Sequence, residues 1–464
     1  MRRPDGSSRS RAAWTRSAPA LVTRDWGVWA VDHGASRALL RRAAREGDLI
    51  AGLLVDDAVA ADPFPRLEEI RTRGPLHRGR LITGTVDHAV GNAVLRSDDF
   101  GVAGGLGHLP PAAQRLVLRL IDDESPGPID PPSLLALDPP DHHRIRRLVS
   151  RAFTARAVAR MEERVVEVAD RLLDDLERRD EATIDLVDAY ASWLPVAVIA
   201  DLLGIPEREH ARLLELGNRA AVLLDPGLPW PAYRSAQRAV RDLHSWFEVH
   251  LDRLAADPGD DLLSTLVTSD DAELLSRVEL RSLALLLLGA GFETTVNLIG
   301  NAVVQLDAHP DQRDIVLADP ARWANAVEEV LRYDPPVQST LRQAYVDTEV
   351  GGEPVATGQG VVVILAGANR DPAVFTEPHR FDVTRENADQ HLSLSAGVHF
   401  CLGAGLARLE TGVALRSLYE RFPDLSLAGR PVRRSTRILR GHEHLPVALR
   451  SRSSQVVMRG PVMR

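Results

Sequence analysis

Apolar residues recur every three or four positions through most of the chain, and this spacing predicts amphipathic α-helices. Segments rich in glycine and proline separate the runs, as at Gly204-Ile-Pro206. A longer helix should begin at the capping box Ser276-Arg-Val-Glu279 and end near Ala308, before His309-Pro310. The other expected helices cover residues 35–46, 66–73, 88–95, 156–178, 186–203, 207–224, 233–256 and 402–422.

Alternating apolar and polar positions, typical of strands, occur only in short stretches. They lie at residues 79–86, 341–344, 348–350 and 361–364. The pattern therefore predicts a mainly α protein with small β-sheets and a single large domain over residues 61–450. Residues 1–60 are expected to form a partly disordered N-terminal extension, because their first part is basic and rich in small residues. Residues 451–464 are expected to form a disordered tail.

The composition narrows the class of protein. A net charge of −9 gives no overall basic field of the kind that attracts nucleic acid. A single cysteine excludes a disulfide framework within the chain and a multi-cysteine zinc cluster. The longest apolar run, Leu283 to Phe292, is shorter than the roughly 18 residues of a membrane span. No apolar signal-peptide core follows the basic N-terminus, so we expect a cytoplasmic protein without a membrane span.

The one cysteine, Cys401, lies in the segment Gly397-Val-His-Phe-Cys-Leu-Gly403, just before the last expected helix. Free N–H groups and the helix dipole favour an anion at such a place, so we expect the thiol pKa to be lowered. Gly397 would permit a turn with positive φ, and Gly403 would let a flat ligand approach the backbone. A small buried hydrophobic residue and a nucleophilic thiol are the alternatives.

This segment resembles the haem-binding signature of the cytochrome P-450 family, Phe-x-x-Gly-x-x-x-Cys-x-Gly, with Leu394 in place of the phenylalanine. The resemblance implies the cytochrome P-450 fold and haem b held by Cys401 as the iron ligand, with Gly397 and Gly403 beside it. It also implies a monooxygenase that uses O2 on a hydrophobic small molecule. Electrons would come from a ferredoxin and a ferredoxin reductase, since no reductase domain is present.

A second motif, Ala290-Gly-Phe-Glu-Thr294-Thr295, lies on the long helix. A threonine hydroxyl there can bond the carbonyl four residues back, that of Ala290, and loosen the helical ladder. A packing glycine beside a polar turn is the alternative. The motif resembles the oxygen-binding groove of the family, with Ala290 and Gly291 against the cofactor. By that resemblance Thr294 holds a hydrogen bond near haem-bound oxygen, and Glu293 relays protons from solvent.

A third motif pairs Glu329 with Arg332 on one face of an apolar helix, where a solvated surface pair is the alternative. It resembles the Glu-x-x-Arg motif of the family, whose third member would be Arg380 in Pro378-His-Arg-Phe381. By resemblance the three form a buried structural network that fixes the loop carrying Cys401.

A final set of residues matches the haem-propionate ligands of the family: His142, Arg146, Arg342 and His399. His142 and Arg146 are four residues apart, on one helical face; His391 is a weaker candidate. By resemblance, Arg144, Arg147, Arg151 and Arg408 would dock an acidic partner, and the substrate pocket would be lined from residues 101–132, 286–294 and 337–341 and around Ile438 and Leu439. A peroxygenase, a haem-based sensor or carrier, and an inactive member without haem stay open as alternatives.

Overall fold

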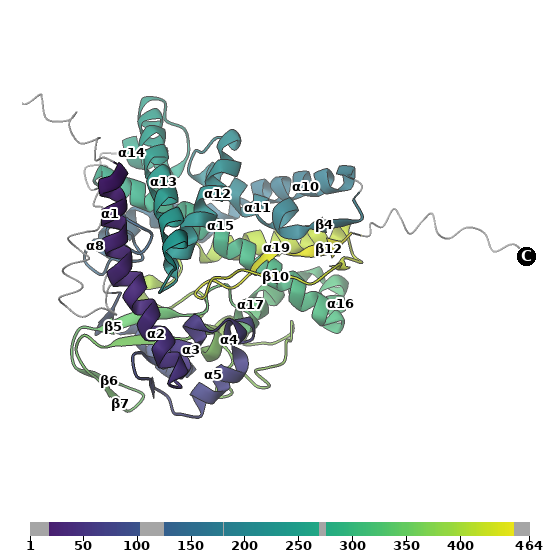
Figure 1. Ribbon diagram of the computed structural model, residues 1–464. Coiled ribbons are helices and arrows are strands. Elements are labelled where there is room, and N and C mark those ends of the chain that lie inside the picture. The colour runs from purple at the N-terminus through teal and green to yellow at the C-terminus, as the bar shows by residue number, and fades with distance from the viewer. Residues whose placement is uncertain (1–17, 103–124, 180, 269–274, 450–464) are drawn as a thin grey trace, which may run out of the picture.

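The computed structural model describes residues 18–102, 125–179, 181–268 and 275–449, and it is predominantly helical (Figure 1). Among these residues the expectation of a mainly α protein with small sheets is confirmed. The longer helices are α1 (Ala18–Trp29), α10 (Glu162–Arg179), α11 (Trp193–Leu202), α12 (His210–Ala221), α13 (Trp230–Ala256), α15 (Arg277–Ala308), α17 (Trp323–Tyr333) and α19 (Ala404–Arg421). The shorter ones are α2 (Ser36–Arg45), α3 (Leu49–Val55), α4 (Asp57–Ala61), α5 (Phe64–Arg71), α6 (His88–Arg96), α8 (Asp141–Val149), α9 (Ala155–Ala159), α14 (Leu262–Thr268), α16 (Pro310–Ala318) and α18 (Leu365–Ala368).

The largest sheet has five strands in the order β1-β2-β8-β5-β3, with β2 and β8 parallel and the other neighbours antiparallel. Its strands are β1 (His77–Arg78), β2 (Thr83–Thr85), β3 (Phe100–Gly101), β5 (Thr340–Ala344) and β8 (Gly360–Val363). Three smaller sheets contain β4 (Thr183–Asp185), β6 (Thr348–Val350), β7 (Glu353–Val355), β9 (Ser426–Leu427), β10 (Val432–Arg433), β11 (His442–His444) and β12 (Pro446–Ala448).

The central helix, α15, begins as the sequence predicts. Ser276 accepts a hydrogen bond from the Glu279 N–H, and the Glu279 carboxylate accepts one from the Ser276 N–H at 2.6 Å. α15 packs against α11, α12, α13, α17 and α19 and is buried along most of its length (Figure 1). By length and composition it is apolar enough to cross a membrane, but 78% of its most apolar window is buried inside the protein, as in a core helix.

Two expected helices differ from the prediction. The segment 156–178 forms two helices, α9 and α10, and Thr154 caps the first by accepting a hydrogen bond from the Ala157 N–H. The segment 186–203 starts with a π-helical turn over Val187–Ala191 before α11. Pro195 follows this turn and cannot donate to the carbonyl of Ala191, so the regular ladder is interrupted there.

Residues 18–61, which fall in the predicted extension, form helices α1 to α4. α1 lies beside α13 (Figure 1), where Asp25 accepts from Arg241 at 2.9 Å. Trp29 donates its indole N–H to the carbonyl of Leu228, in the connection between α12 and α13. The N-terminal helices are therefore fastened to the body of the protein. Residues 1–17 and the predicted tail, 451–464, lie outside the described residues, and the domain boundary at residue 60 stays a prediction.

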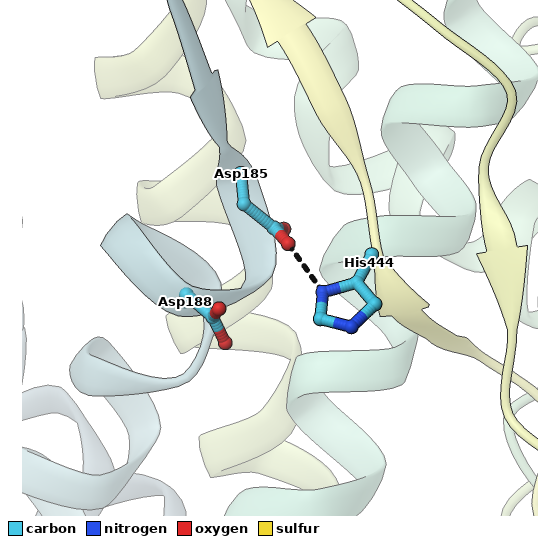
Figure 2. A group of neighbouring side chains, drawn as sticks. All are labelled: Asp185, Asp188 and His444. Atoms are coloured by element: carbon cyan, nitrogen blue, oxygen red, sulfur yellow. Dashed lines mark hydrogen bonds and ion pairs between the residues drawn. The ribbon is translucent and has the colours of Figure 1, made fainter.

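The C-terminal strands are joined to β4 by the antiparallel pairing of β12 and, in addition, by one carboxylate. Asp185 accepts from His444 at 2.7 Å through one oxygen (Figure 2). Its other oxygen accepts from the backbone N–H groups of Val187 and Leu445. The interaction with Asp185 raises the pKa of His444. The contact holds the hairpin of β10 and β11, which lies along α15, against the helical part of the fold.

Candidate functional site

Cys401 sits at the end of a tightly turned loop. Its N–H donates to the carbonyl of Leu394 at 2.8 Å, and Gly397 has a φ of +65°, as the sequence predicts. A Cβ on Gly397 would lie 2.4 Å from the carbonyl oxygen of Leu95, so only glycine fits there. In the described part of the chain, a Cβ on Gly403 would meet no atom beyond its neighbours within 4 Å. The backbone next to the thiol is thus open on that side.

The expected lowering of the Cys401 pKa is wrong. Burial raises the pKa of this thiol, although the Gly403 N–H, Arg146 and Arg408 all act in the opposite direction. α19 begins at Ala404, and the loss of water around the sulfur outweighs the field of its first turn. A buried thiol of this kind ionises when a metal ion binds it, because the ion supplies the missing positive charge.

The middle of α15 is exposed to solvent, whereas the residues before and after it are buried. Ala290 is exposed, while Leu288 and Phe292 on either side are buried. The Thr294 hydroxyl donates to the carbonyl of Ala290 at 2.9 Å, which confirms the expected side-chain contact. A Cβ on Gly291 would lie 2.8 Å from the side chain of Ile199 on α11, so this glycine is needed for helix packing.

Glu293 lies on the inner side of α15 and is almost completely buried, with 2% exposure. One carboxylate oxygen accepts from the Arg434 guanidinium at 3.0 Å. The other has no hydrogen-bond partner among the described residues. Burial raises the pKa of Glu293, and the charge of Arg434 offsets part of that rise. The predicted proton relay therefore begins at a buried ion pair that no motif indicated.

Four basic residues predicted as anion ligands form one group. The rings of His142 and His399 are 4.4 Å apart between centroids, and Arg146 donates to the carbonyl of Phe400, the residue between His399 and Cys401. Arg342 is buried and donates to two uncharged acceptors, the Thr340 hydroxyl and the Leu341 carbonyl. Burial lowers its pKa to about 10.

This basic group has unused hydrogen-bonding capacity. The His142 Nδ1 and His399 Nε2 atoms have no hydrogen-bond partner among the residues described, and burial lowers the pKa of His142 to about 4. The nearby carboxylate is that of Asp138, 3.7 Å from His399. One carboxylate faces this whole group of four basic residues, and the remaining donors are suited to a ligand that carries carboxylates. The Asp138 carboxylate does not cap α8, which begins after Pro140; it accepts hydrogen bonds from the Val102 N–H and the Tyr345 hydroxyl.

His391 and Arg408 do not join this group. His391 lies 3.1 Å from the carboxylate of Glu328, and Arg408 pairs with the same carboxylate. The two basic partners hold the pKa of Glu328 at about 2, against the effect of burial. Arg144 pairs with Glu279, while Arg147 and Arg151 are exposed. Of the four arginines predicted for partner docking, Arg147 and Arg151 are therefore the most exposed to solvent.

The Glu329–Arg332 pair is fully buried and bidentate, with N–O distances of 2.7 and 2.8 Å. The predicted third member, Arg380, is not in the network: its side chain is 57% exposed and pairs with Glu377. Its backbone carbonyl, in contrast, accepts from Arg332. Arg385 supplies the third charge, with its Nε 3.2 Å from Glu329. Sequence spacing gave no signal for Arg385, because the chain folds back on α17 over more than fifty residues.

The arrangement has counterparts among known proteins. A family model described as Cytochrome P450 matches residues 123–317 and 324–435, a range that includes Cys401. A putative cytochrome P450 140 of Mycobacterium tuberculosis (strain ATCC 25618 / H37Rv) is 46% identical over 432 residues, covering 92% of this chain and 98% of that protein. The chain belongs to the cytochrome P450 family.

Further comparisons agree with this membership. The 6-deoxyerythronolide B hydroxylase of Saccharopolyspora erythraea is 44% identical over 319 residues, covering 67% of this cytochrome P450 and 76% of the relative. The ligand-free crystal structure of Mycobacterium smegmatis CYP164A2 has a TM-score of 0.77 at 36% identity and covers 86% of this chain and 99% of that chain. The protein is thus a cytochrome P450 monooxygenase, and haem b is the cofactor of its family.

The residues present fit haem b. The open backbone at Gly403 and the exposed Ala290 leave room for a flat ring, and the His142 Nδ1 atom without a partner and the buried Arg342 suit its two carboxylates. Leu394, which replaces the usual phenylalanine, is buried and still provides the carbonyl that fixes the Cys401 N–H. The departure from the family signature therefore leaves the loop geometry intact.

Proposed function

We propose that this cytochrome P450 inserts one oxygen atom from O2 into a hydrophobic small molecule, with electrons from a ferredoxin and its reductase, in the cytoplasm. The observation that carries the proposal is the position of Cys401. The sole thiol of the chain is held by the Leu394 carbonyl at the end of a glycine-dependent turn, next to a buried basic group.

Each predicted site residue has a task in this proposal. Cys401 is the iron ligand, and the haem supplies O2 activation when bound. His142, Arg146, Arg342 and His399 bind the haem carboxylates, and Gly397 and Gly403 shape the loop against the ring. Ala290 leaves the groove on α15 open, whereas Gly291, predicted to lie against the cofactor, faces Ile199 of α11 and serves the packing of the two helices. Thr294 holds a hydrogen bond in that groove, and Glu293 passes protons toward it.

A hydrophobic substrate is favoured by the apolar side chains near this groove. Leu286, Leu287 and Leu288 precede it on α15, and a β-bridge between Val337 and Leu439 brings two further predicted pocket segments together. Most of the predicted lining loop, residues 103–124, lies outside the described residues. Apolar pockets with a few polar groups are the usual form of small-molecule sites, and a relative is named as the hydroxylase of 6-deoxyerythronolide B.

Turnover tests the proposal. A screen for compounds that shift the spin state of the haem would identify a substrate, which is then incubated with ferredoxin, reductase, NADPH and O2. We expect one oxygenated product molecule for each pair of electrons consumed, and product formation that depends on the ferredoxin. Equal product formation with hydrogen peroxide alone would instead support a peroxygenase, and binding without turnover would support a sensor or carrier.

A further inference from the structure

Buried polar atoms without partners collect on one face of α15, away from the Thr294 groove. Glu293 and Asn297 are one turn apart, and the hairpin of β10 and β11 lies against them. Five buried atoms here have no hydrogen-bond partner among the described residues: one oxygen of Glu293, the oxygen and nitrogen of the Asn297 amide, Nε of Arg434 and Nδ1 of His442. The Asn297 amide is close enough to lower the pKa of Glu293 but makes no hydrogen bond of good geometry.

Several contacts show that these atoms share one place. Arg434 reaches Glu293 at 3.0 Å, and its backbone N–H donates to the carbonyl of Gly441. Gly441 packs so closely on Asn297 that a Cβ there would lie 1.9 Å from the amide oxygen. His442 follows Gly441; burial is the main cause that lowers the pKa of His442 to about 3, and the neighbouring arginines, Arg434 among them, add to it. The five polar atoms therefore form one buried cluster.

A cavity of about 320 Å³ adjoins the cluster at the hairpin. Arg434 and Gly441 belong to its wall, together with Arg433, Arg437 and Arg440. Apolar residues of α3, α5 and β8 form another part of the wall, among them Ile50, Leu67 and Val362. Gln338 and Ser339, from the predicted pocket segment 337–341, also line the cavity. Arg434 thus reaches from this cavity, which lies apart from the Cys401 loop, to the carboxylate of Glu293.

Buried polar groups are rarely left unsatisfied, and ordered water commonly fills this need where several such groups converge. We propose that the cluster holds a chain of water molecules that joins the cavity to Glu293, and that Arg434 is the positioning residue that holds the carboxylate at its inner end. The inference rests on the proposed role of Glu293 in proton delivery. It adds the route by which protons reach Glu293 from solvent, and it assigns the side chains of Arg434 and Asn297 to the lining of that route.

The chemistry of the route is a proton transfer that conserves charge along the chain. Glu293 releases a proton toward the Thr294 groove and takes one from the adjacent water. Each water then receives a proton from the next, so the net loss is one proton from bulk solvent at the cavity. Arg434 stabilises the carboxylate for the interval between its release of one proton and its uptake of the next, because its positive charge opposes the effect of burial.

Infrared spectroscopy of the haem-loaded, resting enzyme tests the route without turnover. The carboxyl band of Glu293 is assigned as the band lost in Glu293→Gln. On transfer to D2O the wild-type band should shift within the mixing time. Asn297→Leu, which replaces the amide with an apolar side chain of similar size, should slow that shift at least tenfold. A shift as fast in Asn297→Leu as in wild type would overturn the route.

Arg434 is tested by titrating the same band. Arg434→Leu should raise the pH at which Glu293 ionises, and Arg434→Lys should restore most of the wild-type behaviour. The control is Arg437→Leu, since Arg437 lines the same cavity but pairs with Asp57; it should leave the titration unchanged. Equal shifts in Arg434→Leu and Arg437→Leu would overturn the assignment of Arg434. Unchanged turnover in Glu293→Gln would refute only the proposed role in proton delivery, because the exchange rate reports water access on its own.

Discussion

The clearest consequence of the structure concerns which arginine completes the Glu329–Arg332 network. Arg385 is 8% exposed, contacts Glu329, and donates to the carbonyls of Thr376 and Arg380. Arg380, five residues earlier, is 57% exposed and forms an ion pair with Glu377 at the surface. Changing each to alanine makes a matched pair, since the same side chain is removed from the same loop.

The expected costs follow from burial. Removing one partner of a buried ion pair costs about 3–5 kcal/mol. Arg332 remains bound to Glu329, so Arg385→Ala should fall near the lower end, at about 3 kcal/mol. An exposed ion pair contributes about 0–1 kcal/mol, so Arg380→Ala should cost less than 1 kcal/mol. With an unfolding slope of about 3 kcal/mol per molar urea, the difference moves the midpoint by nearly 1 M.

Urea unfolding of the haem-loaded protein, followed by tryptophan fluorescence and by the Soret band, measures this difference. Arg385→Ala should unfold at clearly lower urea than Arg380→Ala, which should match the wild type. The reasoning is refuted if the two midpoints coincide, or if Arg380→Ala is the less stable variant. In either case Arg380 would be part of the network in solution, as the family motif suggested.

Three further predictions concern the site and its surroundings. Thr294→Ala should keep haem and substrate binding but convert more of the consumed electrons into hydrogen peroxide; wild-type coupling would make this threonine a packing residue. Burial raises the pKa of Asp225 from 3.8 to about 6, so the folded state holds the proton more tightly and stability falls as pH rises between these values. Asp225→Asn should remove this loss, on the order of 2–3 kcal/mol, with thermal unfolding at pH 4 and pH 7 as the check. Arg147→Glu should slow reduction by a ferredoxin at low salt, and the wild-type rate should itself fall with salt; rates insensitive to both would indicate an apolar docking surface.

Much of the fold follows from local pattern. The capping box at Ser276 and the stop at His309-Pro310 define α15 without reference to any other part of the chain. The turn at Gly397 was predictable for the same reason, since only glycine readily adopts its positive φ. Local spacing also placed Glu329 beside Arg332 and Thr294 beside the carbonyl of Ala290.

Contacts between distant parts of the chain determine the features that the local sequence pattern did not predict. Arg385 and Arg434 meet their carboxylates across long stretches of chain, so no spacing rule could select them from the other arginines. The pKa of Cys401 depends on how completely the folded protein excludes water from the sulfur, and this exceeds the effect of the helix start. The helices of residues 18–61 were only partly predicted, because the contacts that Trp29 and Asp25 make with the connection before α13 and with α13 join residues 199 and 216 positions apart in the chain.

The central claim is that Cys401 is the axial ligand of a haem in a monooxygenase. The most direct test is the absorption spectrum of the reduced, carbon monoxide-bound protein. We predict the red-shifted Soret band of a thiolate complex, present in the wild type and absent in Cys401→Ala. A properly folded wild-type protein whose Soret band lies at the position of a histidine-ligated haem would contradict the assignment. A Cys401→Ala variant that retains the thiolate band would contradict it as well.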